Sequence, residues 1–295
     1  MNIKNQFLFD VLNLNKKKNQ KHENMKVNFF CPLWGSNSIP FEDFVIKAKK
    51  VGYEGVELPL PESKDLQKEY LKILQDYEMP YILQHYQTDK KNVKEYIHEF
   101  SGRLEGLVKE NPVFINSQTG KDFFTFNDNC KIIERANKIE ANSGVTIMHE
   151  IHRGKFSFAC HLMPDYLKAF PEMKITADFS HWVNVSESML EHQQENLEAV
   201  FPNVFHIHSR VGFMESAQVN DPRAPENKPF LERHMEWWDE IIRQRKESGD
   251  SEFTITTEFG PAPYMPLLPY TKQPVANQWD INVFMMDLLR ERYRK

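Results

Sequence analysis

Four short β-prone runs in the sequence each end on a side chain that can bind a divalent metal ion. In chain order, these side chains are Glu150, Asp178, His208 and Glu258. Three carboxylates and one imidazole form a donor set that suits Mn²⁺, Mg²⁺, Co²⁺ or Zn²⁺, whereas copper(I) and iron–sulfur clusters favour softer ligands. The sequence therefore predicts one divalent metal ion, on the condition that the fold brings the ends of the four runs together.

The elements around these residues predict such a fold. β-prone runs alternate with segments of helical apolar spacing in units of roughly thirty residues. Four earlier runs, at 27–31, 55–58, 81–85 and 113–118, bring the number of expected strands to eight. Eight parallel strand–helix units close a (β/α)8 barrel, or TIM barrel, whose active sites lie where the strands end. The length of 295 residues fits a single-domain barrel of this kind, which typically needs about 250 residues.

The two ends of the chain are predicted to differ from the barrel. Residues 1–25 are rich in Asn and Lys and are expected to form a flexible N-terminal extension, which leaves 26–295 for the barrel. After Glu258 the chain is proline-rich from 260 to 269, so this stretch is expected to cross the surface as an extended loop near the end of the eighth strand. The segment 277–292 has the pattern of a closing helix.

Composition argues against several classes of protein. The net charge of −5 disfavours nucleic acid as the main partner, because phosphate binding draws on clustered Lys and Arg. No stretch of about 18 apolar residues is present, so no membrane span is expected, and the N-terminal region lacks the cleavage site of a secretory signal. The three cysteines are far apart and have no CxxC spacing, which favours a reducing compartment and a cytoplasmic location.

Each candidate ligand also has a less specific interpretation. An acid at the end of a strand commonly serves as a helix N-cap or as a partner in a loop salt bridge. His206 shares strand parity with His208 but lies one layer deeper, which favours a hydrogen-bonded core histidine. His149 and His152 have the opposite parity to Glu150 and are interpreted as structural unless that strand ends early. Only the matching positions of all four candidates indicate a metal site.

Four local motifs surround the candidate ligands. They are His149-Glu150-Ile151-His152-Arg153-Gly154, the Asp178-x-x-His181 pair, His206-Ile207-His208-Ser209-Arg210, and Glu258 ahead of Gly260-Pro261. In order and spacing they resemble the xylose isomerase-like barrel superfamily, which holds sugar isomerases, ketose 3-epimerases, inosose dehydratase and endonuclease IV. The resemblance covers the chain from about Met25 to its C-terminus.

The resemblance implies roles for further residues. The four candidates would ligate the metal, and His181 and Arg210 would bind substrate oxygens, as in the ketose 3-epimerases. Four residues at or near the mouths of the first four strands would line the sugar pocket: Trp34, Glu57, His85 and Asn116. Trp34 would otherwise cap the barrel, and Glu57 would otherwise be a buried ion-pair partner. Arg153 is a candidate for an anionic group on the substrate, with a surface position as the alternative.

The function that the resemblance implies is that of a metal-dependent isomerase or epimerase acting on a small-molecule sugar or sugar phosphate. The reaction would pass through an enediolate, with Glu150 removing a proton from one face and Glu258 delivering one to the other. Dehydration of a polyol, as in inosose dehydratase, and a non-catalytic, metal-assisted sugar-binding barrel are the alternatives. Endonuclease IV-like cleavage is disfavoured, because Gln118 and Arg223 stand where that enzyme has further histidine ligands.

The sequence leaves the oligomeric state open. The proline-rich loop and the Trp237-Trp238 pair offer apolar material for a homo-oligomer. The tryptophan pair is nevertheless more typical of helix packing. No nucleic-acid or membrane partner is expected.

Overall fold

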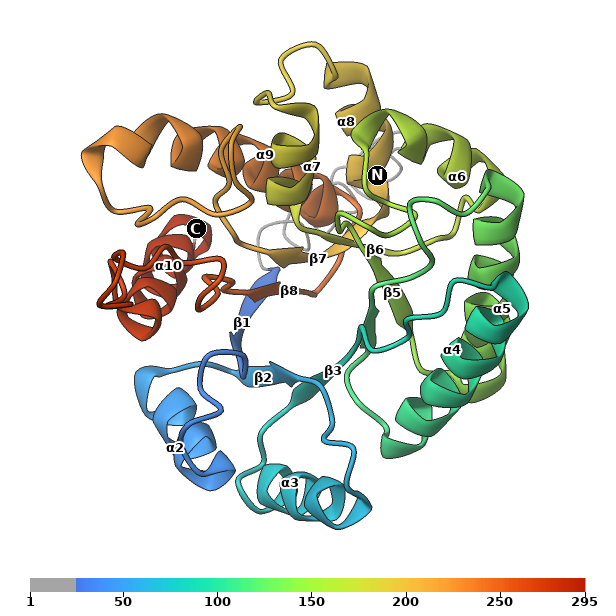
Figure 1. The fold of residues 1–295 in the computed structure, drawn as a ribbon, viewed down its shortest axis with the longest axis horizontal. Helices are drawn as coiled ribbons and strands as arrows, with labels where there is room; N and C mark the ends of the chain where they lie inside the picture. Colours follow the sequence, from blue (N-terminus) through green and yellow to red (C-terminus); the bar gives the residue numbers. More distant parts are fainter. Residues whose placement is uncertain (1–24, 295) are drawn as a thin grey trace, which may run out of the picture.

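Eight parallel strands close into one barrel, which Figure 1 shows end-on. The structure is a computed structural model and describes residues 25–294. The strands are β1 (Lys26–Pro32), β2 (Gly55–Leu58), β3 (Tyr81–His85), β4 (Ile115–Ser117), β5 (Ile147–Glu150), β6 (Ile175–Ala177), β7 (Val204–His208) and β8 (Glu252–Thr256). Each strand pairs with its neighbours in chain order, and β8 pairs back with β1, so that the sheet has no open edge. The predicted single-domain (β/α)8 barrel is confirmed.

The α-helices lie outside the strands and surround them in Figure 1. They are α2 (Phe41–Val51), α3 (Lys64–Asp76), α4 (Val93–Leu107), α5 (Phe126–Ser143), α6 (Met163–Ala169), α7 (Phe179–Ser186), α8 (Gln194–Val200), α9 (Lys228–Glu247) and α10 (Gln278–Tyr293). Several begin at a side chain that accepts a hydrogen bond from the first turn, as Ser63, Asn92, Thr125 and Asn277 do. These caps fix the point at which each helix leaves the loop that borders the barrel mouth.

The inside of the barrel changes from apolar to polar along its axis. Phe30, Ile82, Phe114 and Met148 form a small buried apolar cluster. A Cβ atom added to Gly55 would lie 2.3 Å from the Phe30 ring, so only glycine leaves room for that ring. The Phe114 ring meets the edge of His206, with 5.1 Å between ring centroids, and the polar side chains of the site begin at that level. The apolar cluster therefore packs directly against the polar side chains of the site.

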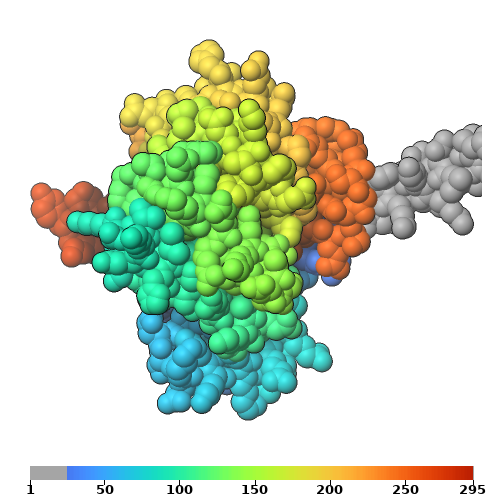
Figure 2. Space-filling view, turned by 90° about the vertical axis from the view of Figure 1, so that its right-hand side faces the viewer, coloured from blue at the N-terminus to red at the C-terminus, as the bar shows by residue number. Residues whose placement is uncertain are grey.

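The loop between β8 and α10 runs over the surface near the end of β8. It contains no regular helix or strand beyond an isolated bridge between Leu267 and Pro274. Leu268 and Tyr270 are exposed in it. Figure 2 shows the barrel from the side, with part of the C-terminal region, in red, projecting at the left.

Several expectations concern the ends and the outer surface of the barrel. Residues 1–24 lie outside the described part of the chain, and Met25 is buried in the core. Trp237 and Trp238 of α9 are both buried, so their rings pack inside the protein. Within residues 25–294, no helix is both long and apolar enough to cross a bilayer.

Candidate active site

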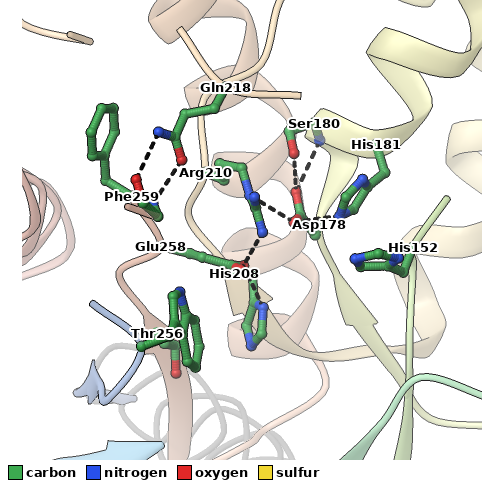
Figure 3. A network of polar contacts seen from close by, with 12 residues as sticks. His152, Asp178, Ser180, His181, His208, Arg210, Gln218, Thr256, Glu258 and Phe259 are labelled. Atoms are coloured by element: carbon green, nitrogen blue, oxygen red, sulfur yellow. Dashed lines mark hydrogen bonds and ion pairs between the residues drawn. The ribbon is translucent and has the colours of Figure 1, made fainter. Parts of the chain in front are cut away.

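The structure brings the ends of β5 to β8 together at one mouth of the barrel. Glu150, Asp178 and His208 each offer a ligand atom within 4.8 Å of the others. Glu258, two residues past β8, places Oε2 2.6 Å from Nδ1 of His208. Figure 3 shows Asp178, His208 and Glu258 around the side chain of Arg210. The four predicted ligands therefore share one site, and metal binding by them stays a prediction.

Asp178 serves two sets of neighbours at once. Its Oδ1 caps α7 by accepting hydrogen bonds from the backbone N–H of Ser180 at 3.1 Å and from the Ser180 hydroxyl at 2.5 Å. Its Oδ2 lies 3.1 Å from Nε of Arg210 and 3.3 Å from Nε2 of His181. The N-cap that the sequence left open as an alternative is thus present, and it leaves one oxygen facing the mouth.

Arg210 joins two of the acids. Its Nε donates to Asp178 Oδ2, and its Nη2 donates to Glu258 Oε1. The guanidinium lies over the ring of Tyr264, 4.2 Å from the ring centroid. Nη1 is buried and has no hydrogen-bond partner among residues 25–294. That nitrogen is therefore available to donate to a substrate oxygen.

The backbone that carries Glu258 is held by two side-chain amides. Asn282 of α10 accepts from the N–H of Phe259 at 2.8 Å and donates to its carbonyl at 3.1 Å. Gln218 does the same at Gly260, at 2.7 Å and 3.1 Å. Because all four backbone groups are satisfied in this way, the segment after Glu258 keeps one conformation although it has left the sheet.

The two glutamates at the mouth are pushed toward opposite protonation states. Burial raises the pKa of Glu150 to about 8, and the negative charges of Glu258 and Asp178 act in the same direction. Burial alone would also raise the pKa of Glu258, but Arg210 and His208 lower it to about 2. In the metal-free protein, burial therefore favours the protonated form of Glu150, whereas Arg210 and His208 favour the ionised form of Glu258. Burial also raises the pKa of Asp178, to about 6, against the effect of Arg210.

His208 lies between two carboxylates. Its Nε2 is 3.0 Å from each oxygen of Glu57, and its Nδ1 faces Glu258. Burial alone would lower the pKa of the imidazole, but Glu57 and Glu258 raise it well above its usual value. His181 differs, because burial and the neighbouring His152 lower its pKa well below the usual range, which keeps that ring neutral.

These residues fit a divalent metal ion. Nδ1 of His208 and Oε2 of Glu258 are buried, and neither atom has a hydrogen bond within the described part of the chain. The two atoms form an ion pair with each other at 2.6 Å, and a bound cation could contact both once the imidazole gives up its proton. With the oxygens of Glu150 and Asp178, the two atoms make an oxygen-rich donor set with one imidazole, which Mn²⁺, Mg²⁺, Co²⁺ and Zn²⁺ accept.

A pocket of about 390 Å³ opens beside Arg210 and Glu258. This volume lies within the range of small-molecule sites, about 300–1,000 Å³. Trp34, which was predicted to line it, does so, and its ring centroid is 6.0 Å from that of His208. The other walls include residues that the sequence did not single out as pocket residues: Gln84, Tyr86, Gln118, His152 and Tyr264.

Glu57 and Asn116, which were predicted to line the sugar pocket, lie beneath it. Both are fully buried. Asn116 Nδ2 donates to Glu57 Oε1 at 2.9 Å and to Glu150 Oε2 at 3.0 Å. His206, the deeper histidine of β7, places Nε2 3.4 Å from Glu57 Oε2. The pocket prediction is therefore corrected for both residues, because their polar atoms face protein groups inside the barrel.

The prediction that His85 lines the pocket is wrong. The His85 ring packs edge-on against Phe100 of α4, with 5.1 Å between centroids, and contacts the hydroxyls of Ser117 and Thr88. Adjacent residues of a strand face opposite sides of the sheet, so Gln84 faces the inside of the barrel and His85 faces the helices. The Gln84 amide donates to Glu57 Oε1, which confirms its inward direction.

His152 was interpreted as structural, but the structure places it in the pocket wall. β5 ends at Glu150, so strand parity no longer applies two residues later. The rings of His152 and His181 lie 3.9 Å apart between centroids, and both side chains can approach Glu150 as ligands. Figure 3 shows the two imidazoles next to each other beside Asp178.

Arg153 lies at the edge of this arrangement. Its Nη1 donates to Asn184 at 3.2 Å, and its guanidinium lies 5.0 Å from the ring centroid of Tyr264. Tyr264 thus faces both Arg210 and Arg153 with one ring. The proline-rich sequence indicated a loop here, but no pattern pointed to Tyr264 as a contact of the two arginines.

Comparison with solved structures finds barrels of the same fold. A probable 3-DHS dehydratase from Bacillus anthracis is 18% identical, with a TM-score of 0.56, and the match covers 90% of this chain and 98% of that chain. A 3-keto-D-glucoside 4-epimerase from E. coli is 12% identical, with a TM-score of 0.57 and coverage of 91% and 100%. A xylose isomerase domain protein from Planctomyces limnophilus is 9% identical, with a TM-score of 0.57 and coverage of 92% and 99%. Comparisons with protein-family models and with curated proteins found no match.

These likenesses define the class of the fold. The chain is a (β/α)8 barrel whose fold is similar over about nine-tenths of its length to these barrels, one of which is a xylose isomerase domain protein. At such low identities the likeness extends to the fold alone, so the activity has to be argued from the site.

Proposed function

We propose that this barrel is a divalent metal-dependent isomerase or epimerase that moves a proton next to the carbonyl group of a sugar or sugar phosphate in the cytoplasm. The observation that carries the proposal is that two glutamates, Glu150 and Glu258, meet at one mouth beside Asp178 and His208. Such a pair can take a proton from one position of a substrate and return one at another. A solved barrel of the same fold is an epimerase, which supports this class of reaction.

Each residue of the mouth has a separate task in this reaction. Glu150, Asp178, His208 and Glu258 would hold the metal ion. When bound, that ion would supply a Lewis acid that stabilises negative charge on the carbonyl oxygen of the substrate. Glu258 accepts the proton from carbon and later releases it to water, and Glu150, after taking up a proton from water, delivers one to the other face or to the neighbouring carbon. In the reverse direction the two glutamates exchange these tasks.

Arg210 and His181 orient the substrate. The unpaired Nη1 of Arg210 donates to a substrate oxygen, while its Nε and Nη2 stay on Asp178 and Glu258. Both ring nitrogens of His181 are buried and lack a hydrogen bond among residues 25–294, so either can contact a hydroxyl group. Trp34 and Tyr264 line the pocket, where their rings would displace water from a bound substrate. A water-poor site strengthens every one of these charge contacts.

Dehydration of a polyol is the second candidate, and His152 favours it. This ring lines the pocket beside His181, and its Nδ1 lies 2.6 Å from the carbonyl oxygen of Arg153, which leaves the lone pair on Nε2. A neutral imidazole there can take the proton from carbon and pass it to the departing hydroxyl group. A probable dehydratase among the solved barrels of this fold supports the candidate.

The first test is the metal content of the purified protein by elemental mass spectrometry. We expect about one equivalent of Mn, Co or Zn, lost in Asp178→Ala and kept in Asp221→Ala. Asp221 is a suitable control because it is an acid outside the mouth that pairs with Arg223. If the wild-type protein holds no metal and takes none up, the proposed reaction is rejected.

The second test is incubation of the metal-loaded protein with ketoses, ketose phosphates and cyclic polyols in D2O. Deuterium at the carbon next to the carbonyl group would identify an isomerase or epimerase, and a product that has lost water would identify a dehydratase. If substrates bind without exchange or water loss, the barrel is a sugar-binding protein and the enzymatic proposal fails.

A further inference from the structure

The carboxylate of Glu57 is surrounded by hydrogen-bond donors. Oε1 accepts from Gln84 at 3.1 Å and from Asn116 at 2.9 Å. Oε2 accepts from Thr256 at 2.5 Å and lies 3.4 Å from Nε2 of His206. Nε2 of His208 is 3.0 Å from both oxygens. These donors come from β3, β4, β7 and β8, so one side chain of β2 connects five strands of the barrel interior.

This saturation leaves Glu57 no capacity for a substrate. An ionised carboxylate has about four lone-pair sites, and five side chains already approach them. The side chain is also fully buried below the pocket. A role for Glu57 in the reaction must therefore act through a neighbour.

His208 is the neighbour that reaches the mouth. Asn116 Nδ2 lies 3.2 Å from Nε2 of His208, but its two hydrogens already have carboxylate acceptors in Glu57 and Glu150. Because an ionised carboxylate can only accept, Nε2 of His208 is then assigned the hydrogen that points at Glu57. In the neutral imidazole, the lone pair then lies on Nδ1. Nδ1 is the atom that faces Glu258 Oε2, 2.6 Å away, on the side of the other candidate ligands.

We propose that Glu57 is a positioning residue that fixes the tautomer and ring orientation of His208, so that Nδ1 and not Nε2 binds the metal ion. This inference rests on the metal site of the proposed function and adds a residue that touches neither metal nor substrate. A carboxylate on the far nitrogen also makes a histidine ligand more basic, and loss of such a partner typically costs about 10- to 100-fold in metal affinity.

Asn116 extends the same control to a second ligand. Its Nδ2 has two hydrogens, and one reaches Glu57 Oε1 while the other reaches Glu150 Oε2. The position of the Glu57 carboxylate therefore influences the position of Glu150 as well as that of His208. Loss of the charge at Glu57 should disturb both candidate ligands. Loss of a donor that contacts only Glu57, such as the Thr256 hydroxyl, should disturb neither.

The decisive measurement uses the wild-type protein. Protein labelled with ¹⁵N-histidine is titrated with Zn²⁺, and long-range ¹H–¹⁵N spectra report the state of each ring nitrogen; the His208 signals are assigned by their absence in His208→Asn. We expect Nε2 to stay protonated and Nδ1 to shift on zinc binding. Zinc on Nε2 would overturn the inference.

Two variants test how much Glu57 contributes to metal affinity. The quantity measured is the dissociation constant for Zn²⁺, by competition with a chromophoric chelator. Glu57→Gln, which keeps the shape but loses the charge, should weaken binding about 10- to 100-fold. The matched control Thr256→Val removes another donor from the same carboxylate and should change the constant less than about threefold.

Equal affinity in wild type and Glu57→Gln would reject the role of Glu57 and leave the proposed function intact. Failure of the wild type to bind zinc would reject both, and if Glu57→Gln does not fold, the spectrum of the wild type decides.

Discussion

Nδ1 of His208 lies 2.6 Å from Oε2 of Glu258, yet the two atoms are not aligned for a hydrogen bond. In the metal-free protein the pair is an ion pair, because Glu57 and Glu258 raise the pKa of His208 well above its usual value in spite of burial. A protonated nitrogen cannot ligate a metal ion. A proton and the metal ion therefore compete for the same atom at the centre of the mouth.

We expect the metal affinity to fall as the pH is lowered. The dissociation constant should rise about tenfold per pH unit for each proton that the metal displaces, and at least one proton should be released per ion bound. Isothermal titration calorimetry between pH 6 and 8, in two buffers with different ionisation enthalpies, measures both quantities. A dissociation constant that does not depend on pH would show that His208 is not a ligand.

Glu150 should make the metal-free protein less stable as the pH rises. Burial and the neighbouring charges raise its pKa to about 8 from the usual value of 4.5. The unfolded chain therefore loses this proton at lower pH than the folded chain, and stability falls between about pH 4.5 and pH 8. Glu150→Gln cannot ionise, so its melting temperature in EDTA should exceed that of the wild type by several degrees at pH 9 and by little at pH 5. A shift of the same size at both pH values would mean that packing, and not charge, is responsible.

Arg210 should be more important for stability without metal than with it. Its guanidinium pairs with Asp178 and Glu258 in a buried position. Removing one partner from a buried ion pair typically costs about 3–5 kcal/mol, because the remaining charge is left without compensation. Arg210→Met should therefore lower the melting temperature strongly in EDTA, and Mn²⁺ should restore most of the loss by supplying positive charge to the same acids. Thermal unfolding with and without Mn²⁺ measures both effects, and an equal loss in the two conditions would contradict the shared site.

The fold, and the meeting of the candidate ligands at one mouth, could be predicted from local patterns. Alternation of β-prone and helical segments predicted the barrel, and closure of the barrel explains why Glu150, Asp178 and His208 meet although they are far apart in sequence. Asp178 shows that two interpretations of one residue can both hold, because one oxygen caps α7 and the other faces the mouth. The sequence alone cannot show that the two oxygens of one carboxylate contact different neighbours.

Side-chain direction at strand ends was the part that local patterns could not supply. His85 is followed by a loop, and only its register with Ser117 shows that it faces outward. His152 lies past the end of β5, where alternation stops, so its direction depends on the loop that follows. Glu57 became a partner of His206 and His208 because β2 and β7 face each other across the barrel, a relationship that only the closed sheet creates.

His152 and His85 make a matched pair for testing these directions. Both rings are buried, and burial lowers the pKa of each to about 3, so both are neutral and similar in kind. His152 lines the pocket beside His181, whereas His85 contacts Ser117, Thr88 and Phe100 behind the sheet. His152→Gln should therefore lower kcat/KM for dehydration by about 100-fold or more, as the loss of an acid–base group does. His85→Gln should leave kcat/KM within about threefold while lowering the melting temperature by several degrees, since a buried hydrogen bond is worth about 1 kcal/mol. The opposite result, an inactive His85→Gln and an active His152→Gln, would place the substrate on the other side of the sheet and reject this assignment of the pocket.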